Sequence, residues 1–234
     1  PTNINQLSDQ LLRLRAQKQS FTLVKLPLSD AILFFTEKQL SWQNVQNSFE
    51  DGFVIAPFLF GISSNNTLFF SAKNKIEIDF SAFASNFETV NQTSDFYSAN
   101  LDTGKVQYKA LVANAVKHIK LGKALKVVTS RIKQINKPST FNPLESYLAL
   151  CGKFPKTMVA WVYAPDQNLE WMGASPESLL SINNSVATSM SLAGTRSVQS
   201  SLSWGEKELT EQAIVTDYLK SIYCLLYTSD AADE

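Results

Sequence analysis

Residues 21–37 read FTLVKLPLSDAILFFTE and hold two runs rich in aromatic and β-branched residues, a composition typical of β-strands. Turn-forming pairs such as Asp51-Gly52 and Asn65-Asn66 separate the runs that follow. Connections this short join antiparallel strands, because a parallel crossover needs a dozen or more residues. This part of the chain therefore predicts antiparallel hairpins. The later runs are GFVIAPF (52–58), NTLFFSA (66–72) and KIEIDF (75–80).

Four helices are expected outside this region. One lies near the start of the chain, and a second covers 105–121. Asn142 followed by Pro143 is a plausible N-cap and first residue for a third. Ser203 and Glu206 fit a capping box for a fourth helix, which would begin at Trp204. The apolar stripes of the first and last helices are Leu7, Leu11, Leu12 and Leu14, and Ile214, Val215, Tyr218, Leu219 and Ile222.

Further strands are expected between these helices. KALKVVTSRI (123–132) is strand-like, 157–165 and 170–175 form a pair, and 178–192 forms a hairpin turning at Asn183-Asn184. The polar stretch 86–104 is expected to be a loop. Strands in groups, with helices inserted between the groups, predict an α+β fold with large antiparallel sheets flanked by helices.

The composition argues against several classes of protein. The chain has 21 acidic and 21 basic residues, so no basic surplus points to nucleic acid or to an acidic membrane surface. No apolar run approaches the roughly 18–20 residues of a transmembrane helix, and we expect no signal peptide and a cytoplasmic location. One histidine and two cysteines argue against a zinc site or a disulfide framework. Carboxylates would have to hold any metal, which favours magnesium or calcium.

Lys126 and Glu177 are the first candidates for chemistry. In a strand, Lys126 would share a face with Val128 and Ser130, and such a lysine usually lies at the surface with its stem covering the sheet. If it faced a closed cavity, Lys126 could act as a base. Glu177 precedes the hairpin, where an edge-strand acid at a turn is the simpler interpretation. Held protonated by apolar surroundings, Glu177 could instead donate a proton.

Three glutamates near the start of the last helix are also candidates. The capping box explains Glu206, and Glu208 could be a solvated acid of the first turn that favours the helix dipole. Glu211 precedes Ile214 and Val215 on the inward stripe, where an unpaired carboxylate is costly. Either a magnesium ion or a buried salt bridge would remove that cost, and the spacing leaves both open.

A base, an acid and a metal carboxylate together suggest acid–base chemistry on an anionic substrate. The small-residue corner Ala193-Gly194-Thr195 adds to this picture. Gly194 would let the backbone approach such a substrate closely, because glycine has no side chain to keep it away.

Four segments, in order along the chain, carry a resemblance to a known family. They are KVVTSR (126–131), GASPESLL (173–180), LAGTR (192–196) and GEKELTEQAIVTDYL (205–219). The chain resembles the chorismate-binding enzymes, which include isochorismate synthase, anthranilate synthase component I, aminodeoxychorismate synthase component I and salicylate synthase. The resemblance runs from about Val106 to Tyr223. It is looser before that, although DGFVIAPF resembles the N-terminal part of bacterial isochorismate synthases.

The resemblance implies a role for each candidate. Lys126 matches the lysine that activates water for attack at C2 of chorismate, and Glu177 matches the acid that protonates the departing C4 hydroxyl. Glu211 matches a magnesium-binding glutamate, with Glu208 one helical turn away. The corner formed by Ala193, Gly194 and Thr195 would line the ring pocket.

The same positions separate the reactions of the family. Anthranilate synthases typically have glutamine in place of Lys126, and aminodeoxychorismate synthases carry a nucleophilic lysine in place of Ala193. Isochorismate synthase, serving menaquinone or siderophore synthesis, is therefore the leading hypothesis. Salicylate synthase is the nearest alternative, anthranilate synthase component I is disfavoured, and a non-enzymatic binding module is the remaining class.

The ends of the chain suggest an incomplete domain. CLLYTSDAADE (224–234) is expected to be a non-native tail, with the helical pattern breaking near Tyr223. The expected organisation is an N-terminal part at 1–104, a truncated chorismate-binding core at 105–223, and that tail. We expect the fragment alone to be inactive, with unpaired strand edges. The complete protein would bind chorismate and magnesium, without nucleic acid or membrane, as a monomer or weak dimer.

Overall fold

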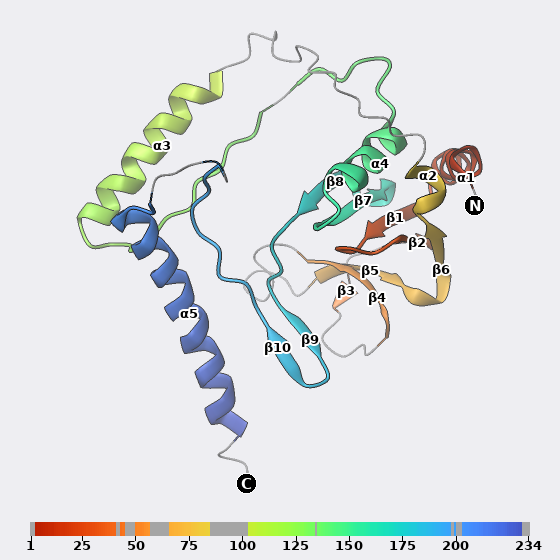
Figure 1. The fold of residues 1–234 in the computed structure, drawn as a ribbon. Coiled ribbons are helices and arrows are strands. Elements are labelled where there is room, and N and C mark those ends of the chain that lie inside the picture. Colours follow the sequence, from red (N-terminus) through yellow and green to blue (C-terminus); the bar gives the residue numbers. More distant parts are fainter. Residues whose placement is uncertain are drawn as a thin grey trace. The chain divides into compact units, whose positions relative to one another are not determined.

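The structure, a computed structural model, describes residues 3–40, 43–44, 50–56, 66–84, 103–133, 135–197, 199 and 203–230. Contacts divide the chain into two compact units (Figure 1). Unit 1 comprises residues 1–93 and 138–176, and unit 2 comprises residues 94–137 and 177–234. Boundaries at residues 104 and 223 were expected from how far the family motifs extend along the sequence. Those boundaries stay a prediction.

Unit 1 is built on a five-stranded antiparallel sheet in the order β6-β2-β1-β7-β8. The hairpin predicted at 21–37 is confirmed, with Ser20 opposite Glu37 and Lys25 opposite Ile32. Strand β1 also pairs with β7, where Phe21 lies opposite Tyr163, so a hairpin from far along the chain completes the sheet. The strands are β1 (Ser20–Lys25), β2 (Ala31–Glu37), β6 (Lys75–Asp79), β7 (Met158–Ala164) and β8 (Leu169–Ser175).

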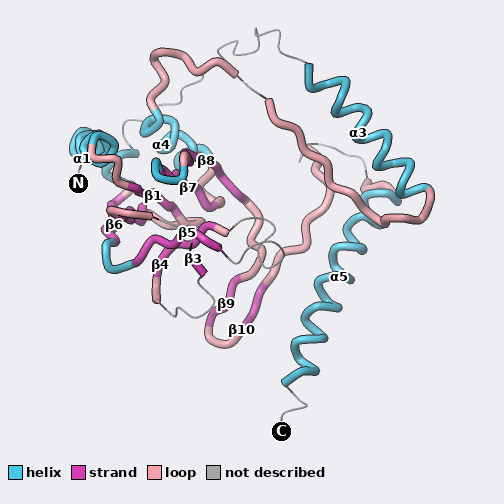
Figure 2. Tube along the Cα trace, turned by 180° about the vertical axis from the view of Figure 1, so that it is seen from behind, coloured by secondary structure: helices cyan, strands magenta, loops and turns pink. Residues whose placement is uncertain are grey.

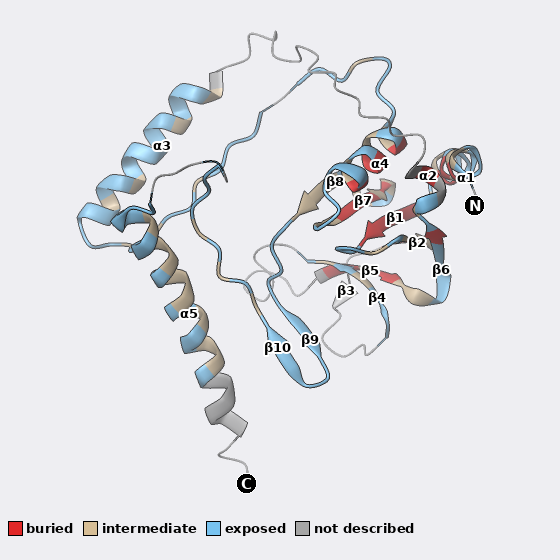
Figure 3. Cartoon of the chain, in the orientation of Figure 1, coloured by how far each residue is buried: buried red, intermediate tan, exposed pale blue. Residues whose placement is uncertain are grey.

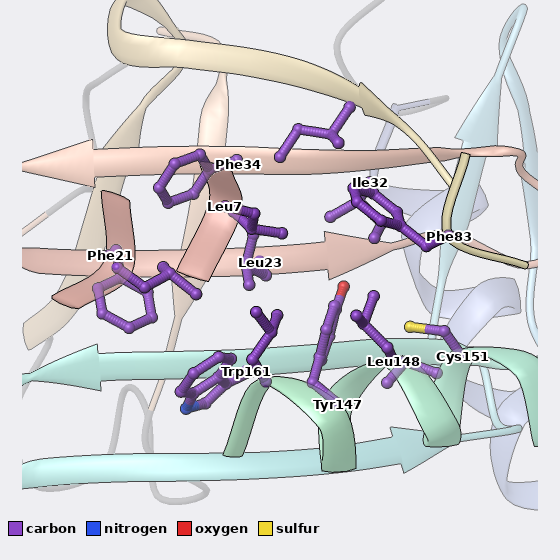
Figure 4. Close-up of a cluster of buried hydrophobic side chains, with 14 of the residues drawn as sticks. Leu7, Phe21, Leu23, Ile32, Phe34, Phe83, Tyr147, Leu148, Cys151 and Trp161 are labelled. Carbon is purple, nitrogen blue, oxygen red and sulfur yellow. The ribbon is translucent and has the colours of Figure 1, made fainter. Parts of the chain in front are cut away.

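Three helices cover one face of this sheet: α1 (Ile4–Ala16), α2 (Ser81–Ala84) and α4 (Pro143–Lys153). Figure 4 shows the resulting core, in which Tyr147 of α4 points its hydroxyl toward the strands and Trp161 of β7 lies beside it. Phe21 meets Trp161 edge-on with ring centroids 5.2 Å apart. The helix predicted at the start of the chain is confirmed, but Leu12 is 60% exposed and lies off its apolar stripe.

A smaller sheet covers the other face, in the order β3-β5-β4. Its strands are β3 (Gln43–Asn44), β4 (Gly52–Ile55) and β5 (Asn66–Ser71), and short 3₁₀ turns follow at Ala72–Asn74 and Pro165–Gln167. Leu68 and Phe70 of β5 pack against Val162 and Ala164 of β7. All six residues of the central strand β1 are therefore buried, as the colouring of Figure 3 shows. Unit 1 confirms the predicted α+β class.

The predicted start of α4 is confirmed in detail. Asn142 accepts hydrogen bonds at its Oδ1 from the backbone N–H groups of Leu144, at 3.0 Å, and Glu145, at 3.4 Å. Pro143 occupies the first helical position, where its missing N–H costs nothing. Such a cap stabilises a helix by about 1 kcal/mol and fixes the direction in which α4 leaves the preceding loop.

Unit 2 contains α3 (Thr103–Lys120), the hairpin strands β9 (Ser181–Asn183) and β10 (Val186–Thr188), and α5 (Glu206–Asp230). The predicted helix at 105–121 and the predicted hairpin are confirmed, although the turn lies one residue later than expected. Asn184 and Ser185 form it with φ of 48° and 63°, the left-handed values that a tight hairpin turn requires. The residues of α3, β9 and β10 are mostly exposed (Figure 3).

The prediction of a strand at 123–132 is wrong. These residues have an irregular backbone, and within the described residues no neighbouring strand pairs with them. A run of β-branched residues forms a strand only where a partner supplies the ladder of hydrogen bonds. Leu125, Val128 and Ile132 remain 80%, 83% and 91% exposed, so the two faces expected around Lys126 do not exist.

The predictions for α5 also need correction. The helix begins at Glu206, and the Leu209 N–H donates to the Gly205 carbonyl at 3.1 Å, so Ser203 lies too far back to be the cap. Tyr218 is 65% exposed and does not belong to the apolar stripe. The helical pattern, expected to break near Tyr223, continues to Asp230.

The expected loop at 86–104 lies outside the described residues up to 102, and its last two residues belong to α3. In the part of the chain that the structure describes, no helix combines the length and the apolar character needed to cross a membrane.

Candidate active site

Lys126 and Glu211 form an ion pair in unit 2. The Lys126 Nζ lies 3.1 Å from the Glu211 Oε1, and the two side chains are 25% and 32% exposed. Helix α5 brings Glu211 to this position because it shares a face with Ile214, three residues later. A salt bridge was one of the two arrangements that the spacing of Glu211 allowed, and the structure shows it, with Lys126 as the partner; magnesium, the other, stays a prediction. An ion pair this accessible contributes little stability, about 0.2–1 kcal/mol.

The ion pair lies in the wall of a cavity of about 700 Å³ within unit 2. Figures 1 and 2 show, from opposite sides, the C-terminal end of α3 beside the N-terminal end of α5, where this cavity lies. The volume is in the range that small-molecule sites occupy. Its lining combines apolar side chains with charged side chains of both signs, and consists of Ile119, Leu125, Lys126, Val127, Glu206, Lys207, Thr210, Glu211 and Ile214.

A second contact holds the segment that carries Lys126 against α3. The Tyr108 hydroxyl lies 3.1 Å from the Thr129 Oγ1, and the Arg131 guanidinium lies 6.0 Å from the centre of the Tyr108 ring. The segment 125–131 thus has side-chain contacts at both ends in place of a β-ladder. These contacts place Lys126, although the prediction that a strand would do so was wrong.

The corner Ala193-Gly194-Thr195 packs against the start of α5. Gly194 has φ of +63°, and a Cβ at this residue would lie 3.2 Å from the Trp204 ring and 3.6 Å from the Glu208 Cγ. Both the backbone conformation and the close contact therefore require glycine. Ala193 is half-buried and Thr195 is exposed. The close neighbours that the structure shows at Gly194 are Trp204 and Glu208, whereas the close approach to a substrate expected from the sequence stays a prediction.

Glu177 lies in the segment between β8 and β9 and is exposed. Its neighbour Ser178 pairs with Met190 across the base of the hairpin, with the Met190 N–H donating to the Ser178 carbonyl at 3.4 Å. Glu177 is not one of the residues that line the cavity. The structure therefore brings Lys126 and Glu211 together and places Glu177 outside their cavity.

Glu208 and Glu211 are the candidates for holding a metal. They lie one turn apart on α5, and oxygen ligands of this kind suit Mg²⁺, which often takes only one or two carboxylates and completes its shell with water and substrate. Within the described residues no three His, Cys, Asp or Glu side chains gather in a way that could enclose a metal. Only Glu211 of the two lines the cavity, and the expectation that the pair holds magnesium stays a prediction.

Several residues of the site were missed by the sequence analysis. Gln212, Ser191 and Thr216 form a hydrogen-bonded group beside the corner, and Ile119 and Lys207 line the cavity. Only one of these contacts had a signal in the sequence. Gln212 and Thr216 are four residues apart and so share a face of α5, but nothing in the sequence indicates that Ser191 is their partner.

The family comparison decides the class of the protein. The family model of the chorismate binding enzymes matches residues 18–221. The chain belongs to this family. Searches among curated proteins and solved structures gave no match.

The match adds to the resemblance seen in the sequence. It begins at residue 18, so it includes the strands of unit 1 as well as the four motifs between 126 and 219. A chorismate binding enzyme acts on chorismate, and chorismate is accordingly the small-molecule substrate. The α+β fold with its five-stranded antiparallel sheet is consistent with the family.

Proposed function

We propose that the protein is an isochorismate synthase that requires magnesium. The observation that carries the proposal is Lys126, whose ammonium lines a substrate-sized cavity beside Glu211. By resemblance this is the position of the lysine that activates water in the family members that hydroxylate C2. Isochorismate would then feed menaquinone or siderophore synthesis, and we expect the reaction to take place in the cytoplasm.

The proposed reaction adds a hydroxyl group from water at C2 of the ring and removes the hydroxyl group at C4. Water forms a bond to C2 and gives one proton to Lys126, the ring double bonds shift, and the C4–O bond breaks. Glu177 gives a proton to the departing C4 oxygen, which leaves as water. Atoms and charges balance because one water enters and one leaves, and the two side chains exchange their protonation states.

Lys126 has to change partner for this chemistry. In the structure its Nζ is paired with the Glu211 carboxylate, whereas a base must present a neutral amine to the attacking water. The proposal therefore requires the ion pair to open when the substrate binds. Glu211 and Glu208 would hold magnesium, and the ion would supply positive charge at the ring carboxylate of chorismate.

Glu177 has to approach the substrate in order to give its proton to the departing C4 oxygen. The residue lies outside the cavity lining and is exposed, so proton donation requires its segment to close over the bound ring. Loops and hairpins that carry catalytic groups often complete a site in this way only when the substrate is bound. The corner at Ala193, Gly194 and Thr195 is proposed to contact the ring.

A product assay tests the proposal. Chorismate and Mg²⁺ are incubated with the 234-residue chain and with the longer protein that the sequence leads us to expect, and the products are separated by chromatography. The proposal predicts isochorismate without pyruvate. Salicylate with pyruvate would identify a salicylate synthase, and anthranilate formed with ammonia would identify an anthranilate synthase. Binding of chorismate without turnover in either protein would contradict the enzyme proposal and favour a binding module.

A further inference from the structure

The segment before the Ala193-Gly194-Thr195 corner is attached to α5 by one side chain. The Gln212 Nε2 donates to the Ser191 carbonyl oxygen at 2.6 Å and lies 3.0 Å from the Ser191 Oγ. The Ser191 Oγ lies 2.9 Å from the Thr216 Oγ1, and the Thr216 hydroxyl donates to the Gln212 carbonyl at 3.0 Å. The three side chains are half-buried. Because a 2.6 Å bond to a backbone carbonyl fixes the main chain itself, the position of Ser191 depends on Gln212.

The attachment involves residues that are close in the sequence to both the corner and the ion pair. Gln212 directly follows Glu211, the partner of Lys126, and Ser191 is two residues before Ala193. On the far side of the corner, the Arg196 guanidinium lies 4.3 Å from the centre of the Trp204 ring. The corner is therefore held at one end against α5, through Gln212, and at the other against Trp204, two residues before that helix begins.

We propose that Gln212 is the positioning residue that sets the corner in register with Glu211 and Lys126. It touches no reacting atom, so its effect is on how well the ring pocket is formed before substrate arrives. Under the proposed function, on which this part of the inference rests, loss of the attachment raises the KM for chorismate more than it lowers kcat.

The first test measures amide hydrogen exchange in the 234-residue chain. Gln212→Met keeps the length of the side chain and removes its donor. It should speed exchange about tenfold at the Met190 amide, which directly precedes Ser191 and donates to the Ser178 carbonyl at 3.4 Å. Ser191→Ala keeps the bond to the backbone carbonyl, so its effect should be about threefold or less. Lys220→Met introduces the same side chain at an exposed position of α5 and should change nothing.

The pattern of exchange separates positioning from simple unfolding. Faster exchange at the Met190 amide, with α5 and strands β9 and β10 unchanged, supports the inference. Unchanged protection of the Met190 amide in Gln212→Met overturns it, and so does faster exchange spread evenly over unit 2, which a general structural role predicts.

The second test uses whichever of the two proteins turns over chorismate. Gln212→Met should raise KM about tenfold with kcat changed less than about threefold, and Lys220→Met should leave both unchanged. A fall in kcat with an unaltered KM contradicts the inference. If no protein turns over chorismate, the proposed function fails, whereas the exchange experiment still decides whether Gln212 holds the corner.

Discussion

The two units of this chain build their structure in different ways. In unit 1, a central strand is buried on both faces and aromatic residues from α4, β1 and β7 interlock. In unit 2, the segment that carries Lys126 has no ladder in the described residues, and single side-chain contacts hold it. Burial of apolar area therefore stabilises unit 1, whereas directional contacts between a few polar groups place the residues of the candidate site.

Because of this difference, a substitution in unit 1 and a substitution in unit 2 should affect different properties of the protein. Apolar burial stabilises a fold by about 25 cal/mol per Å², so one large core side chain is worth several times an accessible hydrogen bond or ion pair. Changes in unit 1 should alter folding, and changes in unit 2 should alter the site while leaving most of the stability in place.

The largest effect is expected from Trp161→Ala in unit 1. Trp161 is 1% exposed, packs against Phe21 and Tyr147, and donates from its Nε1 to Glu170 at 3.1 Å. Its loss should cost about 3–5 kcal/mol of unfolding free energy. Trp204→Ala is the counterpart in unit 2, where Trp204 is 39% exposed, and should cost about 1 kcal/mol. Denaturant unfolding followed by circular dichroism measures both losses of unfolding free energy. Equal losses would contradict the difference between the two units.

The next effect concerns the pH dependence of unit 1. Burial raises the pKa of the Cys151 thiol to about 12, well above its value in an unfolded chain. A raised pKa contributes stability that is complete below the unfolded pKa of about 9 and is lost as the pH rises toward 12. Between pH 9 and 10 the unfolding free energy should therefore fall, with a slope approaching about 1.4 kcal/mol per pH unit from this thiol.

Cys151→Ala provides the control for that slope. The variant should lose the contribution of the thiol while keeping that of Tyr147, whose pKa burial also raises. If wild type and variant lose stability equally between pH 9 and 10, the thiol is not buried in the way the structure shows. The exposed Cys224 should meanwhile react quickly with a thiol reagent, and Cys151 only on unfolding.

A smaller effect is expected at Gly194 in unit 2. Gly194→Ala places a side chain at φ of +63° and 3.2 Å from the Trp204 ring. The left-handed backbone conformation alone should lower the unfolding free energy by about 1–2 kcal/mol once the residue carries a side chain. The contact with the Trp204 ring should lower it further and displace the corner. Gly122→Ala, at φ of +69° with open space around it, isolates the backbone term. Chorismate affinity should fall only in Gly194→Ala, and equal affinities for the two variants would show that the corner does not contact the ligand.

The smallest expected effect is an increase in the stability of unit 1. Gly152 lies in α4, where an added Cβ would meet no other atom within 4 Å and φ is not positive. Gly152→Ala should therefore stabilise unit 1 by about 0.5–1 kcal/mol, because alanine loses less backbone entropy on folding. Thermal unfolding measures this shift. A destabilised Gly152→Ala would mean that α4 is less regular than the structure shows.

The elements of unit 1 were predictable because their signals are local. Alternating and β-branched runs at 21–37 and the Asn142-Pro143 cap need only neighbouring residues to be recognised. The pairing of Phe21 with Tyr163 was not predictable, because nothing in either strand identifies a partner so far along the chain. Pairing partners are set by the packing of the whole core.

The candidate site was predictable to a smaller extent. The spacing of Glu211 indicated an inward carboxylate that needed a partner, and the structure supplies Lys126. The strand expected around Lys126 is absent, because β-propensity forms a strand only where a ladder is available. Gln212 escaped notice since a glutamine in a helix has no special pattern, and only the position of Ser191 reveals its contact.

The roles assigned to Lys126 and Glu177 came from the resemblance to the family. They stay predictions, as does magnesium. The family itself is established by the match over residues 18–221.

The most direct test replaces Lys126, in whichever of the two proteins turns over chorismate, and measures the rate of isochorismate formation. Lys126→Ala should lower that rate about 10²–10⁴-fold, the contribution typical of a catalytic base. The circular dichroism spectrum should be unchanged, and the unfolding free energy should fall by no more than the ion pair contributes, about 0.2–1 kcal/mol. Lys123→Ala, at an exposed position three residues earlier, is the matched control and should retain full activity. Near-normal isochorismate formation by Lys126→Ala would contradict the account, because no base would then be needed at the ion pair with Glu211.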